Sequence, residues 1–336
     1  MEKNENSKMY NMHSFIINDL NEAMQNYRQL SFVKTGFENI DNISPLSPGL
    51  ILLGATPGLG KTTLILQMCD HMAKSGEHIL FFSFEQNGLD FASKSLSRIM
   101  FQQNRSTALS AAKIRLLSSD DERIQEAKNE YLTYADNISF VECTFKMTMS
   151  EIESCINDYI ETTGVKPVVF IDYLQVIHPE PGFSSGAKSD VDNHIKHLED
   201  LKKKLNLIII VISSLNRQNY TSSISLESFK ESGDIEYSAD IIWGLQLKVI
   251  NNDKAFNSNG NPNRKRKAVY TAMAKPVREL ELICLKNRGN LGYYRCCLNY
   301  YPKYDFFEPA PDKTQKLNYE TDNDLFDEEL DFDEEL

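Results

Sequence analysis

A glycine-rich loop between an apolar run and a helical pattern constrains this chain more than any other feature. Residues 51–65 read ILLGATPGLGKTTLI, which fits the relaxed phosphate-binding loop (P-loop) with alanine in the first position. Apolar residues precede the loop, and Leu64, Ile65 and Met68 follow it at helical spacing, which is the strand-loop-helix context that the motif requires. The pattern favours a nucleotide-binding α/β fold over a glycine turn that binds nothing.

The residues of this loop have separate expected roles. Glycines at positions 58 and 60 allow backbone N–H groups to point at an anion, and the N-terminus of the following helix adds a partial positive charge. Lys61 is expected to reach the β- and γ-phosphates, and the Thr62 hydroxyl to bind Mg²⁺. The predicted nucleotide-binding residues are Ala55, Thr56, Pro57, Gly58, Leu59, Gly60, Lys61, Thr62 and Thr63.

Two acidic residues follow other apolar runs. The run VVFIDYLQVI contains Asp172, and FFSFEQ places Glu85 after the first strand beyond the P-loop helix. An acid at the tip of a strand beside a P-loop holds Mg²⁺ in enzymes of this class. Glu85 is positioned to polarise the attacking water, although a solvated acid at a strand end explains it equally well from its context alone. Thr62 and Asp172 are therefore the predicted metal ligands, and Glu85 is the predicted catalytic base.

Apolar runs alternate with helical segments along the body of the chain. This alternation is typical of a mostly parallel, twisted α/β sheet with helices on both faces, and runs such as LIIIVI indicate strands buried on both sides. The predicted strands are residues 51–54, 79–84, 138–142, 168–171, 207–212, 241–247 and 280–285.

The two ends of the chain differ from this body. Residues 15–30 place apolar side chains at helical spacing, so residues 1–33 are expected to hold a linker-type amphipathic helix, which packs on its own domain or on a neighbouring subunit. Residues 320–336 contain ten acidic residues and no basic one, and therefore account for −10 of the net charge of −12. We expect residues 309–336 to be a disordered acidic tail that either solubilises the protein or docks elsewhere.

Composition narrows the class of protein. The hydrophobic fraction of 41% is enough for a core, no run of eighteen apolar residues occurs, and the N-terminus lacks the apolar region of a secretory signal. The six cysteines show no metal-binding spacing. We expect a soluble, cytoplasmic protein with reduced cysteines and no membrane contact, and the near-neutral body leaves a nucleic-acid partner open.

Several short motifs occur in a fixed order along the chain: TGFENID, the P-loop, FSFEQ, KIR, FIDYLQVI, ISSLNR, FKESGDIEYSADII and LKNRGNLG. This set resembles the RecA-like motor domain of the DnaB-type replicative helicases over about residues 33–308, and we expect residues 34–308 to form that domain. The resemblance implies an ATP-hydrolysing DNA helicase or translocase that uses ATP and Mg²⁺ in DNA replication. It also implies a homo-oligomer, a hexameric ring that moves on single-stranded DNA, with a loader or primase as a further partner. A motor-only chain of this kind suits a phage, plasmid or other mobile element.

The resemblance also assigns residues to the reaction. It makes Lys61 and Glu85 catalytic residues of the chain's own site. Lys286 and Arg288, in LKNRG, match the basic pair that such helicases insert into the nucleotide site of a neighbouring subunit. A guanidinium at the γ-phosphate stabilises charge in the transition state, so these two residues are catalytic residues expected to act in trans.

Two loops are expected to face the central channel of the ring. They are residues 178–190 and 216–233, both rich in glycine, serine and asparagine. We expect them to track the backbone of single-stranded DNA, although simple surface loops would have the same composition. A lysine replaces the arginine that the family places in this element. The predicted DNA-binding residues are Lys230, Glu231, Gly233 and Arg217.

Departures from the family keep a second hypothesis open. Ser214 stands where the family places a glutamine that couples the γ-phosphate to the DNA loop, and the family's N-terminal helical domain is not expected here. The alternative is a RecA-like, DNA-stimulated ATPase that acts as a loader, a recombination accessory or an assembly switch without unwinding. A defective copy retained as a scaffold is a third hypothesis. Four basic residues at positions 264–267 lie in an insertion that we expect to be a solvated loop, with DNA contact as the alternative.

Overall fold

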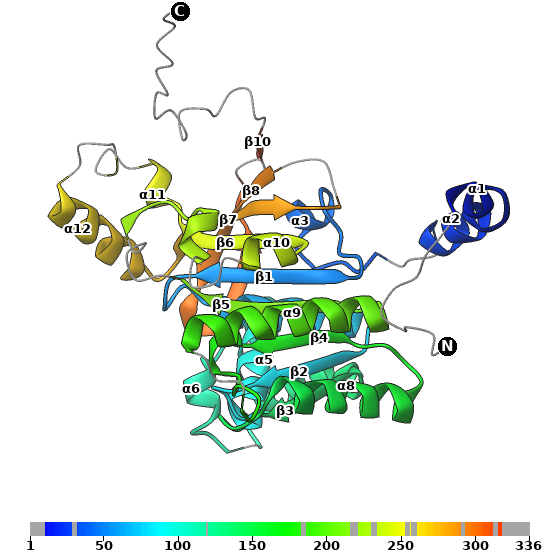
Figure 1. Cartoon of the computed structure of the whole chain (residues 1–336). Coiled ribbons are helices and arrows are strands. Elements are labelled where there is room, and N and C mark those ends of the chain that lie inside the picture. The colour runs from blue at the N-terminus through cyan, green and yellow to red at the C-terminus, as the bar shows by residue number, and fades with distance from the viewer. Residues whose placement is uncertain are drawn as a thin grey trace, which may run out of the picture.

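The computed structural model describes residues 11–28, 32–118, 120–182, 186–215, 221–229, 234–252, 256, 261–289, 293–311 and 315–317. Within these residues, one sheet forms the centre of the molecule (Figure 1). Its strands are β1 (Gly49–Ala55), β2 (Ile79–Ser83), β3 (Ile138–Glu142), β4 (Val168–Asp172), β5 (Ile208–Ser214), β6 (Ile241–Leu247), β7 (Arg278–Asn287), β8 (Tyr293–Tyr301), β9 (Phe306–Pro309) and β10 (Gln315–Leu317). They are ordered β10-β8-β7-β6-β1-β5-β4-β2-β3, and β9 pairs with β8.

The part of the sheet from β3 to β6 is parallel. β1 pairs with β5 and β6, β4 joins β5 to β2, and β3 lies outermost. Beyond β6, the strands β7, β8, β9 and β10 are antiparallel. All residues of β1, β4 and β6 are buried, as expected for strands covered on both faces. The predicted mostly parallel α/β sheet is confirmed.

Helices lie on both sides of this sheet (Figure 1). The longer ones are α2 (Leu20–Arg28), α4 (Lys61–Lys74), α5 (Gly88–Gln103), α7 (Glu122–Leu132), α8 (Met149–Thr163), α9 (Ala187–Leu205) and α12 (Pro262–Met273). The shorter ones are α1 (Met12–Ser14), η1 (Phe15–Asp19), α3 (Glu38–Asp41), α6 (Ala111–Ile114), η2 (Ala135–Asn137), η3 (Leu174–Val176), η5 (Leu226–Phe229), α10 (Asp234–Ser238), α11 (Val249–Asn252) and η7 (Pro302–Tyr304).

The two faces of the sheet have separate hydrophobic cores. Because side chains alternate along a strand, Ile51 and Leu53 of β1 lie in the core that contains α4, whereas Leu50 and Leu52 lie in the core that contains α8 and α9. Figure 1 shows α8 and α9 side by side on one face. This packing fixes the strands from both sides and positions the loops at their carboxyl ends.

The seven strands predicted from apolar runs are all present, with ends shifted by at most two residues. β8, β9 and β10 were not predicted, because apolar and polar residues are mixed in these segments. β10 lies within residues 309–336, for which we expected disorder, and it pairs with β8, so the sheet extends beyond the expected motor boundary at residue 308. Residues 318–336, with the acidic repeat, lie outside the described residues.

The predicted N-terminal helix spans α1, η1 and α2 without a break. It stands beside the body of the molecule in Figure 1, and none of its described side chains is buried. Its exposed apolar residues are Met12, Ile16, Ile17 and Met24. Packing of this helix on its own domain, one of the two hypotheses, is not observed in the described part of the chain.

The basic insertion is a helix, so the expected solvated loop was wrong. α12 begins after Asn261, whose side chain accepts a hydrogen bond from the backbone of Asn263, and Pro262 occupies the first helical turn. Both residues are favoured at helix N-termini. No disulfide bond joins the six cysteines, all of which lie within the described residues. No helix in the described part of the chain is long and apolar enough to cross a membrane.

Candidate nucleotide-binding site

The P-loop connects the end of β1 to the first turn of α4. Gly58 and Gly60 adopt φ angles of 81° and 85°, in the left-handed region that favours glycine. A Cβ atom at Gly60 would also lie 2.7 Å from Cζ of Tyr300. Glycine at position 60 is therefore required by both the backbone and the packing, and the loop can turn its N–H groups inward.

Lys61 is held at the base of this loop. Its Nζ donates a hydrogen bond to the carbonyl oxygen of Ala55 at 2.9 Å. Burial lowers the pKa of Lys61, while the negative charges of Asp172 and Glu85 oppose that shift. These interactions place the predicted phosphate-binding ammonium group between the loop and two carboxylates.

Thr62 and Asp172 form a direct contact between two segments of the site. Asp172 ends β4, which is separated from β1 by β5, and its Oδ2 accepts a hydrogen bond from the Thr62 hydroxyl at 2.7 Å. Burial raises the pKa of Asp172 to about 6 and Glu85 adds to the increase, whereas the Thr62 hydrogen bond and Lys61 oppose it. A hydroxyl and a carboxylate are oxygen ligands of the kind that Mg²⁺ prefers, so the residues present fit this ion.

Glu85 lies beside this pair. β2 ends at Ser83, which is the register partner of Asp172, and the Phe84 N–H donates to the Asp172 carbonyl oxygen at 2.9 Å. Glu85 itself is exposed, and its charge acts on the pKa values of both Lys61 and Asp172. The structure therefore brings the predicted base together with the predicted phosphate and metal ligands, on the side that water can reach.

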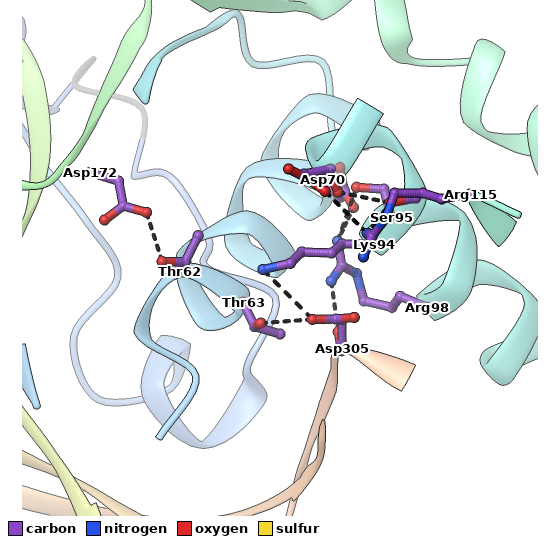
Figure 2. A network of polar contacts seen from close by, with 11 residues as sticks. Thr62, Thr63, Asp70, Lys94, Ser95, Arg98, Arg115, Asp172 and Asp305 are labelled. Carbon is purple, nitrogen blue, oxygen red and sulfur yellow. Dashed lines mark hydrogen bonds and ion pairs between the residues drawn. The ribbon is translucent and has the colours of Figure 1, made fainter. Parts of the chain in front are cut away.

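A polar network extends from the P-loop helix to α5 and to the β8–β9 turn (Figure 2). The Thr63 hydroxyl donates to Asp305 Oδ1 at 3.1 Å, and Lys94 Nζ lies 3.8 Å from the same oxygen. Arg98 donates to the carbonyl oxygen of Asp305 at 2.8 Å and forms a buried ion pair with Asp70. These contacts join α4 and α5 behind the site and hold α4 in place.

Two cations of the site were missed from the sequence. Lys94, on α5, acts on the pKa of Asp172 as well as pairing with Asp305. Arg278, at the start of β7, donates to the carbonyl oxygen of Gly58 at 2.7 Å. Neither residue belongs to a nucleotide-binding motif, and only the fold brings them to the P-loop, so the sequence carried no local signal for them.

Ser214 ends β5, directly beside the end of β1, where it is the register partner of Ala55. Its backbone N–H donates to Oε1 of Gln175 at 3.0 Å, and Nε2 of Gln175 donates to the hydroxyl of Ser213 at 2.9 Å. A glutamine side chain therefore lies at the end of β5, although it comes from η3. Gln175 lies three residues after Asp172 in FIDYLQVI, and this nearness to the predicted metal ligand was the sequence signal that could have placed it at the site.

Lys286 and Arg288 are not at the chain's own P-loop. Lys286 is the register partner of Ile242, which is the partner of Leu52, three residues before Ala55. At about 3.3 Å per residue this is roughly 10 Å along the strands. β7 begins near the P-loop, and the chain moves farther from the loop after Lys286. Arg288 is bound to Asp240, the residue before β6. Arg288 therefore lies near the amino-terminal ends of β1 and β6, whereas the P-loop follows the carboxyl end of β1, and Lys286 lies between these two levels.

The predicted DNA-binding residues Lys230, Glu231, Gly233 and Arg217 lie outside the described residues. Phe229, which directly precedes Lys230, is buried against β1. A Cβ atom at Gly54 would lie 2.3 Å from the Phe229 ring, so glycine at position 54 is what lets this ring pack against the strand that leads into the P-loop.

The profile of the DnaB-like helicase C terminal domain family matches residues 32–308. Replicative DNA helicase DnaB of Pasteurella multocida (strain Pm70) is 27% identical over 251 residues, which cover 72% of this chain and 50% of that protein. The DnaB of Buchnera aphidicola subsp. Baizongia pistaciae is 28% identical over 226 residues, covering 64% of this chain and 46% of its own. The chain thus spans about half the length of these curated relatives.

Solved structures agree on the fold. One solved ATPase domain superposes with a TM-score of 0.69 at 20% identity, covering 90% of this chain and all of that one. A DnaB-like replicative helicase, solved in a study of its interactions with primase, gives a TM-score of 0.70 at 20% identity and covers 88% of this chain and 69% of that one. With the family profile matched over most of its length, the chain belongs to the DnaB-like helicase C terminal domain family.

Proposed function

We propose that this protein is an ATP-dependent DNA helicase or translocase of the DnaB type. The observation that carries the proposal is the hydrogen bond between Thr62 and Asp172, which joins the P-loop to the strand-end acid within reach of the charges of Lys61 and Glu85. These four residues supply what phosphoryl transfer needs: phosphate binding, metal ligands and a group that orients water.

Each residue of the site has one part in hydrolysis. The N–H groups of the P-loop and the Lys61 ammonium hold the phosphates, and Thr62 and Asp172 would hold Mg²⁺, which neutralises developing charge on the phosphates when bound. Glu85 orients a water molecule and takes its proton as the water oxygen bonds to the γ-phosphorus. The bond between the γ-phosphorus and the leaving ADP oxygen breaks, which gives ADP and phosphate.

Lys286 and Arg288 are proposed to complete the site of a neighbouring subunit. Their place on the side of the sheet away from the P-loop supports a role outside the chain's own nucleotide site. A ring in which each subunit offers one edge to the next would bring them to a second P-loop. Hydrolysis would then depend on assembly.

The N-terminal helix is the proposed contact that holds such an assembly together. Met12, Ile16 and Ile17 are each more than half exposed, and burying such side chains against a neighbour would be favourable. We propose a homo-oligomer, a hexameric ring, in which this helix packs on the adjacent subunit. A loader or primase is proposed as a further partner.

Single-stranded DNA is the proposed substrate track, contacted by Lys230, Glu231, Gly233 and Arg217. Because a lysine contacts a phosphate as a point charge, we expect binding through the DNA backbone with a strong dependence on salt. The packing of Phe229 on β1 gives this element a fixed origin beside the nucleotide site.

The alternative function, a RecA-like ATPase that does not unwind, is favoured by one observation, the serine at position 214. Gln175 lies beside it and offers an amide at the same strand end. Strand displacement from a forked duplex, measured together with ATP hydrolysis and oligomer mass, separates the two functions. A helicase displaces the strand, whereas the alternative hydrolyses ATP under DNA stimulation and leaves the duplex intact.

A further inference from the structure

Asp240 directly precedes β6, at the amino-terminal end of the parallel strands and away from the P-loop. Its Oδ2 accepts a hydrogen bond from the Leu50 N–H at 2.8 Å and pairs with the ammonium group of Lys202. Lys202 is only 8% exposed, and this carboxylate is the opposite charge that it contacts. Asp240 thereby joins α9 and β1 at the point where β6 begins.

The same residue holds Arg288. The Arg288 N–H donates to the Asp240 carbonyl oxygen at 2.8 Å, and Nη1 of Arg288 lies 3.5 Å from Oδ1 of Asp240. The guanidinium is 48% exposed, so one side of it faces solvent. Because Lys202 already neutralises the carboxylate, Asp240 can orient Arg288 while leaving its positive charge available to a phosphate.

Backbone carbonyl oxygens in the last turn of α10 also bind these cations. Lys286 Nζ donates to the carbonyl oxygen of Glu236, and Nη2 of Arg288 donates to that of Tyr237. Carbonyl oxygens at a helix C-terminus lack intrahelical partners and carry partial negative charge, which favours cations. Lys286 and Arg288 are thus each held by a backbone carbonyl oxygen of α10, and Arg288 also contacts Asp240.

We propose that Asp240 is a positioning residue that aims Arg288, with Lys286 beside it, at the nucleotide site of the neighbouring subunit. The inference rests on the proposed function, in which these two cations act in trans. It adds that Asp240, which is itself held by Leu50 and Lys202, sets the orientation of these two side chains within their own subunit.

Mixed assemblies test this inference. Asp240→Asn subunits have an intact P-loop and a misdirected Arg288, whereas Lys61→Ala subunits have a defective P-loop and a well-placed Arg288. We expect each variant alone to lose at least tenfold of the DNA-stimulated ATPase rate. In co-expressed, doubly tagged assemblies, about one quarter of the interfaces would combine the two intact halves if subunits mix at random, and the rate should rise several-fold above either variant alone.

One further mixed assembly and one control variant make the outcomes distinct. Arg288→Ala mixed with Lys61→Ala tests the trans site itself, and if that mixture shows no rise, the proposed trans function fails. If the ATPase rate rises in that mixture but not in the mixture of Asp240→Asn with Lys61→Ala, only the positioning role is overturned. Glu153→Gln is the matched control, because Glu153 is also about one-quarter exposed and also holds two partners, His197 and Lys204, and we expect it to keep the wild-type rate.

Folding of the variant is checked at its own site. Asp240→Asn should bind a fluorescent ATP analogue as wild type does, since its P-loop is untouched. If it does not bind, Asp240→Glu replaces it in the mixture, because it keeps the negative charge for Lys202 while displacing the carboxylate by one methylene. A mixture of Asp240→Glu and Lys61→Ala that fails to rise, although it binds the analogue, would also contradict the positioning role.

Discussion

The Thr62 hydroxyl, in the first turn of α4, donates a hydrogen bond to Oδ2 of Asp172, at the end of β4, at 2.7 Å. Asp172 is almost fully buried, and its pKa is raised to about 6. Without a cation, this carboxylate is therefore easier to protonate than an ordinary aspartate. The site is arranged to favour a positive ligand at this point.

Asp172→Asn should therefore stabilise the metal-free protein while abolishing Mg²⁺-dependent hydrolysis. Because the folded pKa of about 6 exceeds the ordinary value of 3.8, the native state binds more protons between these pH values, so wild-type stability falls as pH rises from about 4 to 6. Removing the charge should raise the free energy of unfolding by on the order of 2 kcal/mol at pH 8. Denaturant unfolding in EDTA at pH 4 and pH 8 measures this. An equal effect of the substitution at both pH values would contradict the account.

Glu85→Gln should block hydrolysis and leave nucleotide binding intact. The side chain is exposed, so its replacement removes a proton acceptor without disturbing the core. General-base catalysis contributes about 10² to 10⁴ in rate, and the loss of ATPase rate should lie in this range. Single-turnover hydrolysis and equilibrium binding of a labelled nucleotide, run on one preparation, give both quantities. A weakened affinity with a normal rate would assign Glu85 to binding instead.

Gly60→Ala should abolish nucleotide binding by moving the P-loop. A Cβ atom there meets the Tyr300 ring and also requires a positive φ. Gly76→Ala is the matched control, since Gly76 has a φ of 96° with nothing within 4 Å of the added atom. The control should lose only the stability that a non-glycine residue costs at a positive φ angle, about 1 kcal/mol. The difference in thermal stability between the two variants measures the steric clash with Tyr300. Equal losses of stability would show that the Tyr300 ring moves aside.

Arg98→Met should be among the more destabilising single changes at the site. It leaves Asp70 buried without its ion pair and removes the hydrogen bond to the Asp305 carbonyl oxygen. Loss of one partner of a buried pair costs about 3–5 kcal/mol. Lys74→Met, which breaks the exposed pair with Glu130, should cost less than about 1 kcal/mol. Urea unfolding compares the two variants, and similar midpoints would argue that the network is not structural.

The fold was largely predictable because its central strands are continuous apolar runs. β6 was predicted to the residue, since strands buried in a parallel sheet need apolar side chains on both faces. β3 was also predicted to the residue, although it lies outermost in the sheet and none of its residues is buried. β8 was missed because tyrosine, arginine and asparagine alternate with buried positions along it. α12 was taken for a loop because its basic residues follow a stretch rich in asparagine and glycine, although Asn261 and Pro262 are typical of a helix start.

Site residues could be predicted where a local sequence motif indicates the role of each residue. Thr62 was named from the P-loop motif and Asp172 from its position at the end of an apolar strand, and the fold brings the two together. Lys94 and Asp305 could not be found in this way. Their contact joins α5 to the β8–β9 turn, and no local pattern encodes a meeting of segments so far apart in the chain.

The central claim is that ATP hydrolysis by this protein moves it along DNA and separates strands. The most direct measurement is displacement of a labelled strand from a forked DNA duplex, with Lys61→Ala as the control and ATP hydrolysis followed in the same sample. The account predicts displacement by the wild-type protein that requires ATP and Mg²⁺ and is absent from Lys61→Ala. Hydrolysis stimulated by single-stranded DNA, with no displaced strand at any protein concentration or loading condition, would contradict it.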